Sequence, residues 1–85
     1  MDQQVTFSTH AIERCAARGI DEIDIYDVLK NPDHIVQETS CKHIYQKLIS
    51  ENNNRMLLRV FVNICKEPTI VITAYKTSKL DKYEY

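Results

Sequence analysis

The stretch RMLLRVFVNICKEPTIVITAYK, from Arg55 to Lys76, decides how the rest of the chain folds. Side-chain character alternates through both of its halves with the two-residue period of a β-strand. The segment between the halves, Lys66-Glu67-Pro68, is long enough only for a turn. The pattern therefore predicts two antiparallel strands, Arg55–Cys65 and Thr69–Lys76.

Two shorter strands are expected upstream, at Ile35–Glu38 and His43–Ile49, joined by a turn at Ser40-Cys41-Lys42. The segment Ser50–Asn54 contains three successive asparagines, which tolerate positive φ and compete with regular backbone pairing, so we expect a loop there. Connections this short make successive strands antiparallel. The prediction is a four-stranded antiparallel sheet.

Two helices are expected before the strands. The first begins after Ser8 or Thr9, either of which can cap it, and ends at Gly19. The second begins at Asp21 and ends at Asn31-Pro32. One face of the first helix carries Ala11, Ile12, Cys15 and Ala16, and the stripe of the second carries Ile23, Ile25, Tyr26, Val28 and Leu29. The order predicts one α+β domain, residues 1–85, with both helices packed on one face of the sheet.

The alternation assigns each strand residue to one of two faces. We expect the helices to cover the apolar set Ile44, Leu48, Met56, Leu58, Val60, Val62, Ile64, Ile70, Ile72 and Ala74. The opposite face is then open and carries polar, aromatic and cationic side chains, namely His43, Tyr45, Lys47, Arg59, Thr73 and Tyr75. Val71 is expected on that same open side.

Composition narrows the class of protein. The chain has 85 residues, of which 44% are hydrophobic and 27% charged, values typical of a globular domain. No apolar run reaches the roughly 20 residues that a membrane span needs. The start, MDQQVTFSTH, lacks the basic and then apolar pattern of a signal peptide, so we expect a cytoplasmic protein.

The cysteines and histidines predict no metal site and no cofactor. Cys15, Cys41 and Cys65 are an odd number and show no C-x-x-C spacing, so we expect reduced thiols packed as small apolar groups. The three histidines form no H-x-x-x-H pair.

Charge divides unequally between the two halves. Residues 1–41 carry a net charge of −5 (three basic, eight acidic side chains), whereas residues 42–85 carry +4 (eight basic, four acidic). Such asymmetry favours an anionic partner for the basic half, with a dipolar surface kept for solubility as the alternative.

Three segments of the chain are FSTHAIERCAARGI (Phe7–Ile20), VLKNP (Val28–Pro32) and ITAYKTSKLDKY (Ile72–Tyr83). Together they resemble domain-of-unknown-function family 4258 of small bacterial proteins. The resemblance implies kinship with the RelE/ParE and barnase–EndoU–colicin nucleases, many of which pair as toxins with a small antitoxin protein. It also implies a RelE-like domain that cleaves RNA. The family motif falls on His10, Arg14, Arg18, Thr73, Tyr75, Lys79 and Lys82.

Metal-free RNA cleavage needs a base for the 2′-hydroxyl, a cation for the phosphorane and an acid for the leaving oxygen. Arg59 is the expected phosphate clamp because its guanidinium offers a bidentate fork, and Arg14 is the second choice. Tyr75 is expected to donate a proton or to stack on a base, Thr73 to bind a phosphate oxygen, and His10 to act as the base. The substrate is expected to be mRNA, held by Tyr45, Lys47, Lys76, Lys79 and Lys82.

Each of these assignments has a structural alternative. His10 can instead satisfy a strand end, and Arg59 can pair with a surface acid. Thr73 and Tyr75 are also common in strands for their propensity alone. The open face offers no carboxylate base of the barnase kind. The rival functions are a non-catalytic module that binds protein or nucleic acid through this face, and a purely structural partner subunit.

Overall fold

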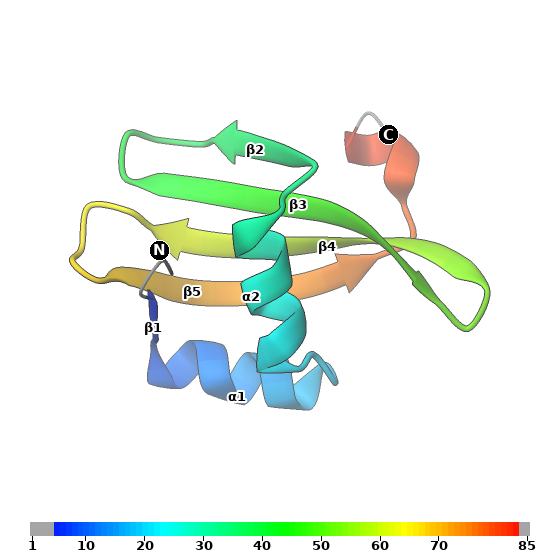
Figure 1. The fold of residues 1–85 in the computed structure, drawn as a ribbon, viewed down its shortest axis with the longest axis horizontal. Helices are drawn as coiled ribbons and strands as arrows, with labels where there is room; N and C mark the ends of the chain where they lie inside the picture. The colour runs from blue at the N-terminus through cyan, green and yellow to red at the C-terminus, as the bar shows by residue number, and fades with distance from the viewer. Residues whose placement is uncertain (1–4, 84–85) are drawn as a thin grey trace.

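The computed structural model describes residues 5–83, which form two helices and one five-stranded sheet (Figure 1). The elements in chain order are β1 (Val5–Phe7), α1 (Thr9–Ala17), α2 (Glu22–Lys30), β2 (His34–Gln37), β3 (Lys42–Glu51), β4 (Asn54–Asn63), β5 (Thr69–Thr77) and a short 3-10 helix, η1 (Leu80–Tyr83). The predicted α+β class is confirmed. Neither helix offers an apolar stretch of the length needed to cross a bilayer, within the described part of the chain.

The sheet is mixed and has the strand order β1-β5-β4-β3-β2, so the prediction of four antiparallel strands is wrong. The additional strand, β1, runs parallel to β5 and pairs Val5 with Thr69 and Phe7 with Val71. The Ser8 N–H extends this pairing by donating to the Val71 carbonyl at 3.2 Å. A strand of three residues is too short for a period of two to show, which is why the sequence pattern missed it.

Residues at the ends of the two helices determine where each helix begins and ends. Ser8 caps α1, since its Oγ accepts a hydrogen bond from the Ala11 N–H at 3.0 Å. Gly19 follows α1 with a φ of +65°, a conformation that other residues rarely adopt. Asp21 precedes α2 in extended conformation but makes no side-chain cap hydrogen bond. Its charge and those of the first-turn acids Glu22 and Asp24 still interact favourably with the helix dipole.

The β3–β4 hairpin turns on only two residues, which corrects the predicted loop Ser50–Asn54. Asn52 and Asn53 both have positive φ, 52° and 67°, as a type I′ turn requires. The ladder therefore continues to the pair Glu51–Asn54. The tight turn fixes the register of the two strands, and hence the faces of their side chains.

That register moves the β3 side chains to the faces opposite those predicted. Tyr45 pairs with Val60 and Lys47 with Leu58, so both lie on the helix-covered side, as does His43. Conversely, the β3 residues facing the same way as Arg59 are Ile44, Gln46 and Leu48. The error arises because a one-residue change in pairing exchanges the two faces of a strand.

A bulge in β5 makes a second exchange. Phe61 pairs with Thr73 but Val62 pairs with Val71, which leaves Ile72 as an extra residue. Val71 therefore enters the core together with Ala74, and Ile70, predicted to be buried by the helices, pairs with Asn63. Ile64, also predicted there, follows the end of β4 and is exposed.

One apolar core joins the helices to the sheet. It comprises Ala11, Cys15, Ile20, Ile25, Val28, Leu29, Leu58, Val60, Val62, Val71 and Ala74. The β4 members are alternate residues, and α2 lies across the strands in Figure 1. Each buried Val, Leu or Ile contributes about 1.5–3 kcal/mol relative to exposure, so this core is the main source of stability.

Cys41 and Cys65 form a disulfide, contrary to the prediction that all three cysteines are reduced thiols. The β3–β4 ladder ends at the pair Lys42–Asn63, which brings the chain on both sides of it together. The two Cα atoms are then 5.1 Å apart, within disulfide reach. Cys15 alone is a free thiol, and it is buried as predicted.

Candidate functional site on the open sheet face

The sheet face turned away from the core is called the open face here. Direct pairing puts Arg59 opposite Tyr75 and Phe61 opposite Thr73, so these side chains share it. From β3 it receives Gln46, which pairs with Arg59 on its other side. The face thus consists of alternate residues of three neighbouring strands, namely Ile44, Gln46, Leu48, Leu57, Arg59, Phe61, Thr73, Tyr75 and Thr77.

Arg59 is the centre of the open face and is only 9% exposed. Its Nε donates to Gln46 Oε1 and its Nη1 donates to Tyr75 Oη, both at 2.6 Å. Gln46 is itself 1% exposed, so its side chain is held in place by packing. Both bonds are charge-assisted, and together they fix the plane of the guanidinium.

The C-terminal segment returns over this face. The Tyr83 ring, from η1, lies with its centroid 4.1 Å from Arg59 Cζ. Its hydroxyl is 2.8 Å from the hydroxyl of Tyr75. The Phe61 and Tyr75 rings stack at 5.8 Å, and the Phe61 ring is 5.4 Å from Arg59 Cζ. Three aromatic rings therefore surround one guanidinium, a cation–π arrangement.

The two phenols have pKa values displaced in opposite directions. Burial raises the pKa of Tyr75, and the hydrogen bond to Tyr83 adds to this effect, although Arg59 opposes it. The hydrogen bond with Tyr75 lowers the pKa of Tyr83, and the positive charges of Lys82 and Arg59 act in the same direction. Tyr83 is thus the phenol that loses its proton more readily.

Arg59 has only neutral partners within residues 5–83. The ion pairs there are Lys42–Glu38, Lys47–Asp27 and Lys76–Glu51. A buried cation without a nearby carboxylate is costly unless hydrogen bonds or an anion compensate it. Its two hydrogen bonds use two of the five N–H donors of a guanidinium, and the Tyr83 ring packs against the same group.

A second arginine approaches the same strand from α1. Arg18 Nη1 donates to the Ala74 carbonyl at 2.8 Å and to Thr73 Oγ1 at 3.3 Å. Beyond Val71, β5 has no strand neighbour on its β1 side within residues 5–83, so this carbonyl would otherwise lack a partner from the described sheet. Arg18 thereby secures the strand edge and brings a second positive charge to Thr73.

Of the predicted site residues, the structure brings Arg59, Tyr75 and Thr73 to one face. It places Tyr45 and Lys47 on the helix-covered side, where Lys47 Nζ binds Asp27 at 2.8 Å. Lys82 is exposed in η1 with its Nζ 5.8 Å from the Tyr83 ring centroid, beside the site. The other predicted residues lie apart. Lys76 binds Glu51 at 2.7 Å, His10 and Arg14 are exposed on α1 without a hydrogen bond to Arg59, Thr73 or Tyr75, and Lys79 is exposed beyond β5.

Gln46 and Tyr83 are the site residues that sequence reasoning missed. A two-residue turn at Asn52-Asn53 would have given the register and put Gln46 beside Arg59. Tyr83 left no comparable signal, because a tyrosine beyond the last strand can fold back in many ways. Among residues 5–83, no three His, Cys, Asp or Glu side chains gather as a metal site would require.

The fold and this face define a small α+β protein with a buried cation framed by aromatic and amide groups. In a comparison with known families, the model of Domain of unknown function (DUF4258) matches residues 7–76. The chain therefore belongs to the DUF4258 family. No curated protein and no solved structure matches it.

Proposed function

We propose that this protein is a metal-independent endoribonuclease that cleaves mRNA in the cytoplasm as the toxin of a toxin–antitoxin pair. The observation that carries the proposal is the Arg59 guanidinium, buried between Gln46 and Tyr75 with no carboxylate partner in residues 5–83. An RNA phosphate would supply the missing negative charge. Because a guanidinium binds phosphate through two parallel N–H groups, Arg59 would act as the clamp on the scissile phosphate.

The base for the 2′-hydroxyl in this proposal is Tyr83 rather than His10. Tyr83 lies against Arg59, and its pKa is lowered by Tyr75 and by the neighbouring positive charges. Its phenolate would accept the 2′ proton while Arg59 steadies the charge that develops on the phosphorane. Tyr75, whose O–H can donate to that phenolate, would position it.

In this proposal Tyr75 and Tyr83 both act on the side of the attacking 2′-oxygen. Displacement at phosphorus proceeds in line, so the attacking 2′-oxygen and the leaving 5′-oxygen lie on opposite sides. Two hydroxyls 2.8 Å apart cannot reach both sides. Thr73, two residues along β5 and hydrogen-bonded to Arg18, would donate a hydrogen bond to the leaving 5′-oxygen, which takes its proton from a water molecule as the P–O5′ bond breaks. Lys79 and Lys82 would hold flanking phosphates.

The proposed kinship with the RelE/ParE and barnase–EndoU–colicin nucleases rests on the order of two helices followed by four antiparallel strands, and on a basic residue in a central strand. A cytoplasmic toxin would meet conditions that keep thiols reduced, so the Cys41–Cys65 bond would open there. Activity should therefore be measured with and without reductant.

The test is cleavage of a single-stranded RNA oligonucleotide by purified protein in EDTA. We expect a 2′,3′-cyclic phosphate product and no cleavage where the nucleotide 5′ to the scissile phosphate lacks its 2′-hydroxyl. Arg59→Lys and Tyr83→Phe should each reduce kcat by about 100–1,000-fold, the usual effect of removing one transition-state group. Arg55→Lys, an exposed change on the same strand, is the matched control.

Intact RNA with the wild-type protein in both redox states, or full activity of Arg59→Lys, would contradict the nuclease proposal. In cells, induced expression should arrest growth, and the Arg59→Lys variant should not.

A second candidate is a non-catalytic module that binds nucleic acid or protein through the open face. This candidate is favoured by the Tyr83 ring, which covers Arg59 closely, because a cation held in one position suits a fixed binding surface. This module would bind the same RNA in EDTA and leave it intact, with an affinity that falls as salt rises. Binding that does not respond to salt would instead indicate a protein partner.

A further inference from the structure

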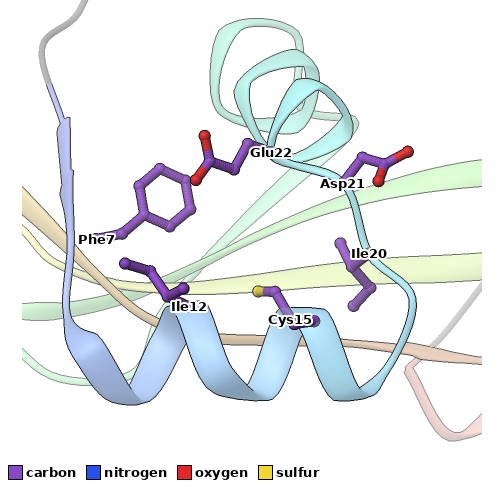
Figure 2. Close-up of a pocket in the computed structure, with 7 residues that line it drawn as sticks. Phe7, Ile12, Cys15, Ile20, Asp21 and Glu22 are labelled. Atoms are coloured by element: carbon purple, nitrogen blue, oxygen red, sulfur yellow. The ribbon is translucent and has the colours of Figure 1, made fainter.

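A groove on the helix side of the molecule has no part in the proposed nuclease. It lies between α1 and the start of α2, encloses about 250 Å³, and is lined by Phe7, Ile12, Cys15, Ala16, Ile20, Asp21 and Glu22. Figure 2 shows Phe7, Ile12 and Cys15 directed into this space. Burial raises the pKa of the Cys15 thiol, so this side chain lines the groove as a neutral, weakly polar group.

Both sides of the groove expose large apolar side chains. Ile12 on α1 is 51% exposed, and on α2 Ile23 is 80% and Tyr26 44% exposed. Ile23 and Tyr26 are three residues apart on one helix, so they are neighbours on its surface. The Tyr26 ring meets Phe7 edge to face at 5.7 Å, which connects this surface to the groove. Exposed apolar side chains that adjoin a groove are a common feature of interaction sites.

The charge around the groove is negative. Asp21 and Glu22 line the groove, and Glu13 shares the outer surface of α1 with Ala16. None of these three carboxylates forms an ion pair within residues 5–83.

Neither arginine of α1 lines the groove. The charge of Arg18 acts on the Cys15 thiol, but its guanidinium is bound to the edge of β5, and Arg14 lies half a turn from the Ile12–Ala16 stripe. On α2, Lys30 is two turns beyond Ile23.

We propose that this groove, with Ile12, Ile23 and Tyr26 at its margins, binds a basic amphipathic helix of a partner protein. An apolar side chain of the partner enters between Phe7, Ile12 and Ile20, as an anchor residue enters a pocket. Lysines or arginines beside that anchor lie over Asp21 and Glu22. Apolar residues at helical spacing match a groove between two helices, and the partner's charge complements the carboxylates.

The same charges disfavour a symmetric dimer. A two-fold contact would place the groove of one copy on the groove of another, because such an interface uses the same patch twice. Asp21 and Glu22 of both copies would then meet in a partly desolvated interface, where like charges repel strongly.

The test uses two synthetic helical peptides with leucine at positions i, i+3, i+4 and i+7. One carries lysine at the remaining positions and the other carries glutamate. Titrated into the ¹⁵N-labelled full chain, the lysine peptide should saturate and shift the amide signals of Phe7, Ile12, Ile20 and Glu22. The glutamate peptide should bind at least about ten-fold more weakly because its charge repels the groove.

Variants separate this surface from general attraction of a basic peptide to an acidic protein. Ile12→Ser with Ile23→Ser should weaken the lysine peptide by about ten-fold or more, as loss of interface anchors does. Ile35→Ser is the matched control, since Ile35 is 41% exposed on β2, outside the groove, and it should leave binding unchanged. Asp21→Lys with Glu22→Lys should reverse the preference, so that the glutamate peptide binds better.

Three outcomes would overturn the proposal. The first is equal affinity for the two peptides. The second is a set of shifted signals centred on the open face instead of the groove. The third is a concentration-dependent dimer in analytical ultracentrifugation that the Ile12→Ser, Ile23→Ser variant abolishes, which would assign the groove to a second copy of the chain.

Discussion

Both faces of the sheet bury apolar side chains, but the buried polar side chains of residues 5–83, Gln46 and Arg59, lie on the open face. On the helix-covered face, Leu58, Val60 and Val62 are buried against apolar residues of α1 and α2. On the open face, Arg59 and Gln46 are almost as deeply buried, although they are polar and the cover comes from aromatic rings and η1. The comparison separates two uses of burial, since the first face stabilises the fold and the second holds a cation in one orientation.

The largest effect should come from the helix-covered face. Leu58→Ala removes a side chain that is 1% exposed and leaves a cavity in a small core. We expect the free energy of unfolding to fall by about 2–5 kcal/mol, a large part of the total for a domain of this size. Urea denaturation followed by circular dichroism would measure it, and a loss under 1 kcal/mol would mean that this core is not the main source of stability.

Opening the disulfide should have the next largest effect. Cys41 and Cys65 are 24 residues apart, and loss of a bridge over such a span costs roughly 3 kcal/mol in the chain-entropy description. Cys41→Ser with Cys65→Ser should show this loss in urea, and the wild type in reductant should behave in the same way. Equal midpoints for the oxidised and reduced wild type would contradict the expectation.

Replacing Arg59 by methionine together with Gln46 by leucine should change stability little, which sharpens the comparison between the faces. When a buried charged group and its hydrogen-bonding partner are both replaced by apolar residues, the effect is often neutral or stabilising, because the desolvation cost of the charge disappears and no buried acceptor is left unpaired. We expect a change within about 1 kcal/mol in either direction, together with loss of RNA cleavage. A loss as large as that of Leu58→Ala would instead make Arg59 a structural residue.

The smallest effect is expected for Lys47→Met, which tests whether Lys47 lies on the helix-covered face of the sheet. The hydrogen bond from Lys47 lowers the pKa of the Asp27 carboxyl, so the folded state favours the charged form. The resulting stabilisation is present above the ordinary pKa of Asp and is lost as pH falls through the lowered value. Lys47→Met should return the Asp27 pKa toward its ordinary value in an NMR titration. An unchanged pKa would remove the evidence that Lys47 faces α2.

The sequence predicted the elements whose signals lie in residues close together along the chain. Both helices follow from the spacing of their apolar residues and from helix-ending residues such as Gly19. The strands β4 and β5 follow from the alternation of apolar and polar residues. The β3 faces could not be assigned without knowing the turn, since one residue more or less in the hairpin exchanges them. The bulge at Ile72 had the same consequence for Val71 and Ile70.

Contacts between residues far apart in the sequence were the other features that could not be predicted. Of the site, the sequence placed Arg59, Tyr75 and Thr73 on one face, as the structure does. The remaining parts of the site come from tertiary placement that alternation cannot reveal, namely Gln46 through the register and Tyr83 through the return of the C-terminal segment. The Cys41–Cys65 bond escaped prediction for the same reason, because spacing alone did not show that two turns meet.

The parallel pairing of β1 with β5 has a consequence for how the chain is made. Val5 leaves the ribosome well before its partner Thr69. The β3–β4 hairpin can close as soon as its own residues emerge, whereas the β1 edge must stay unpaired until β5 has been made. Closure of such a distant contact is slow, so this edge is expected to be the last part of the sheet to pair.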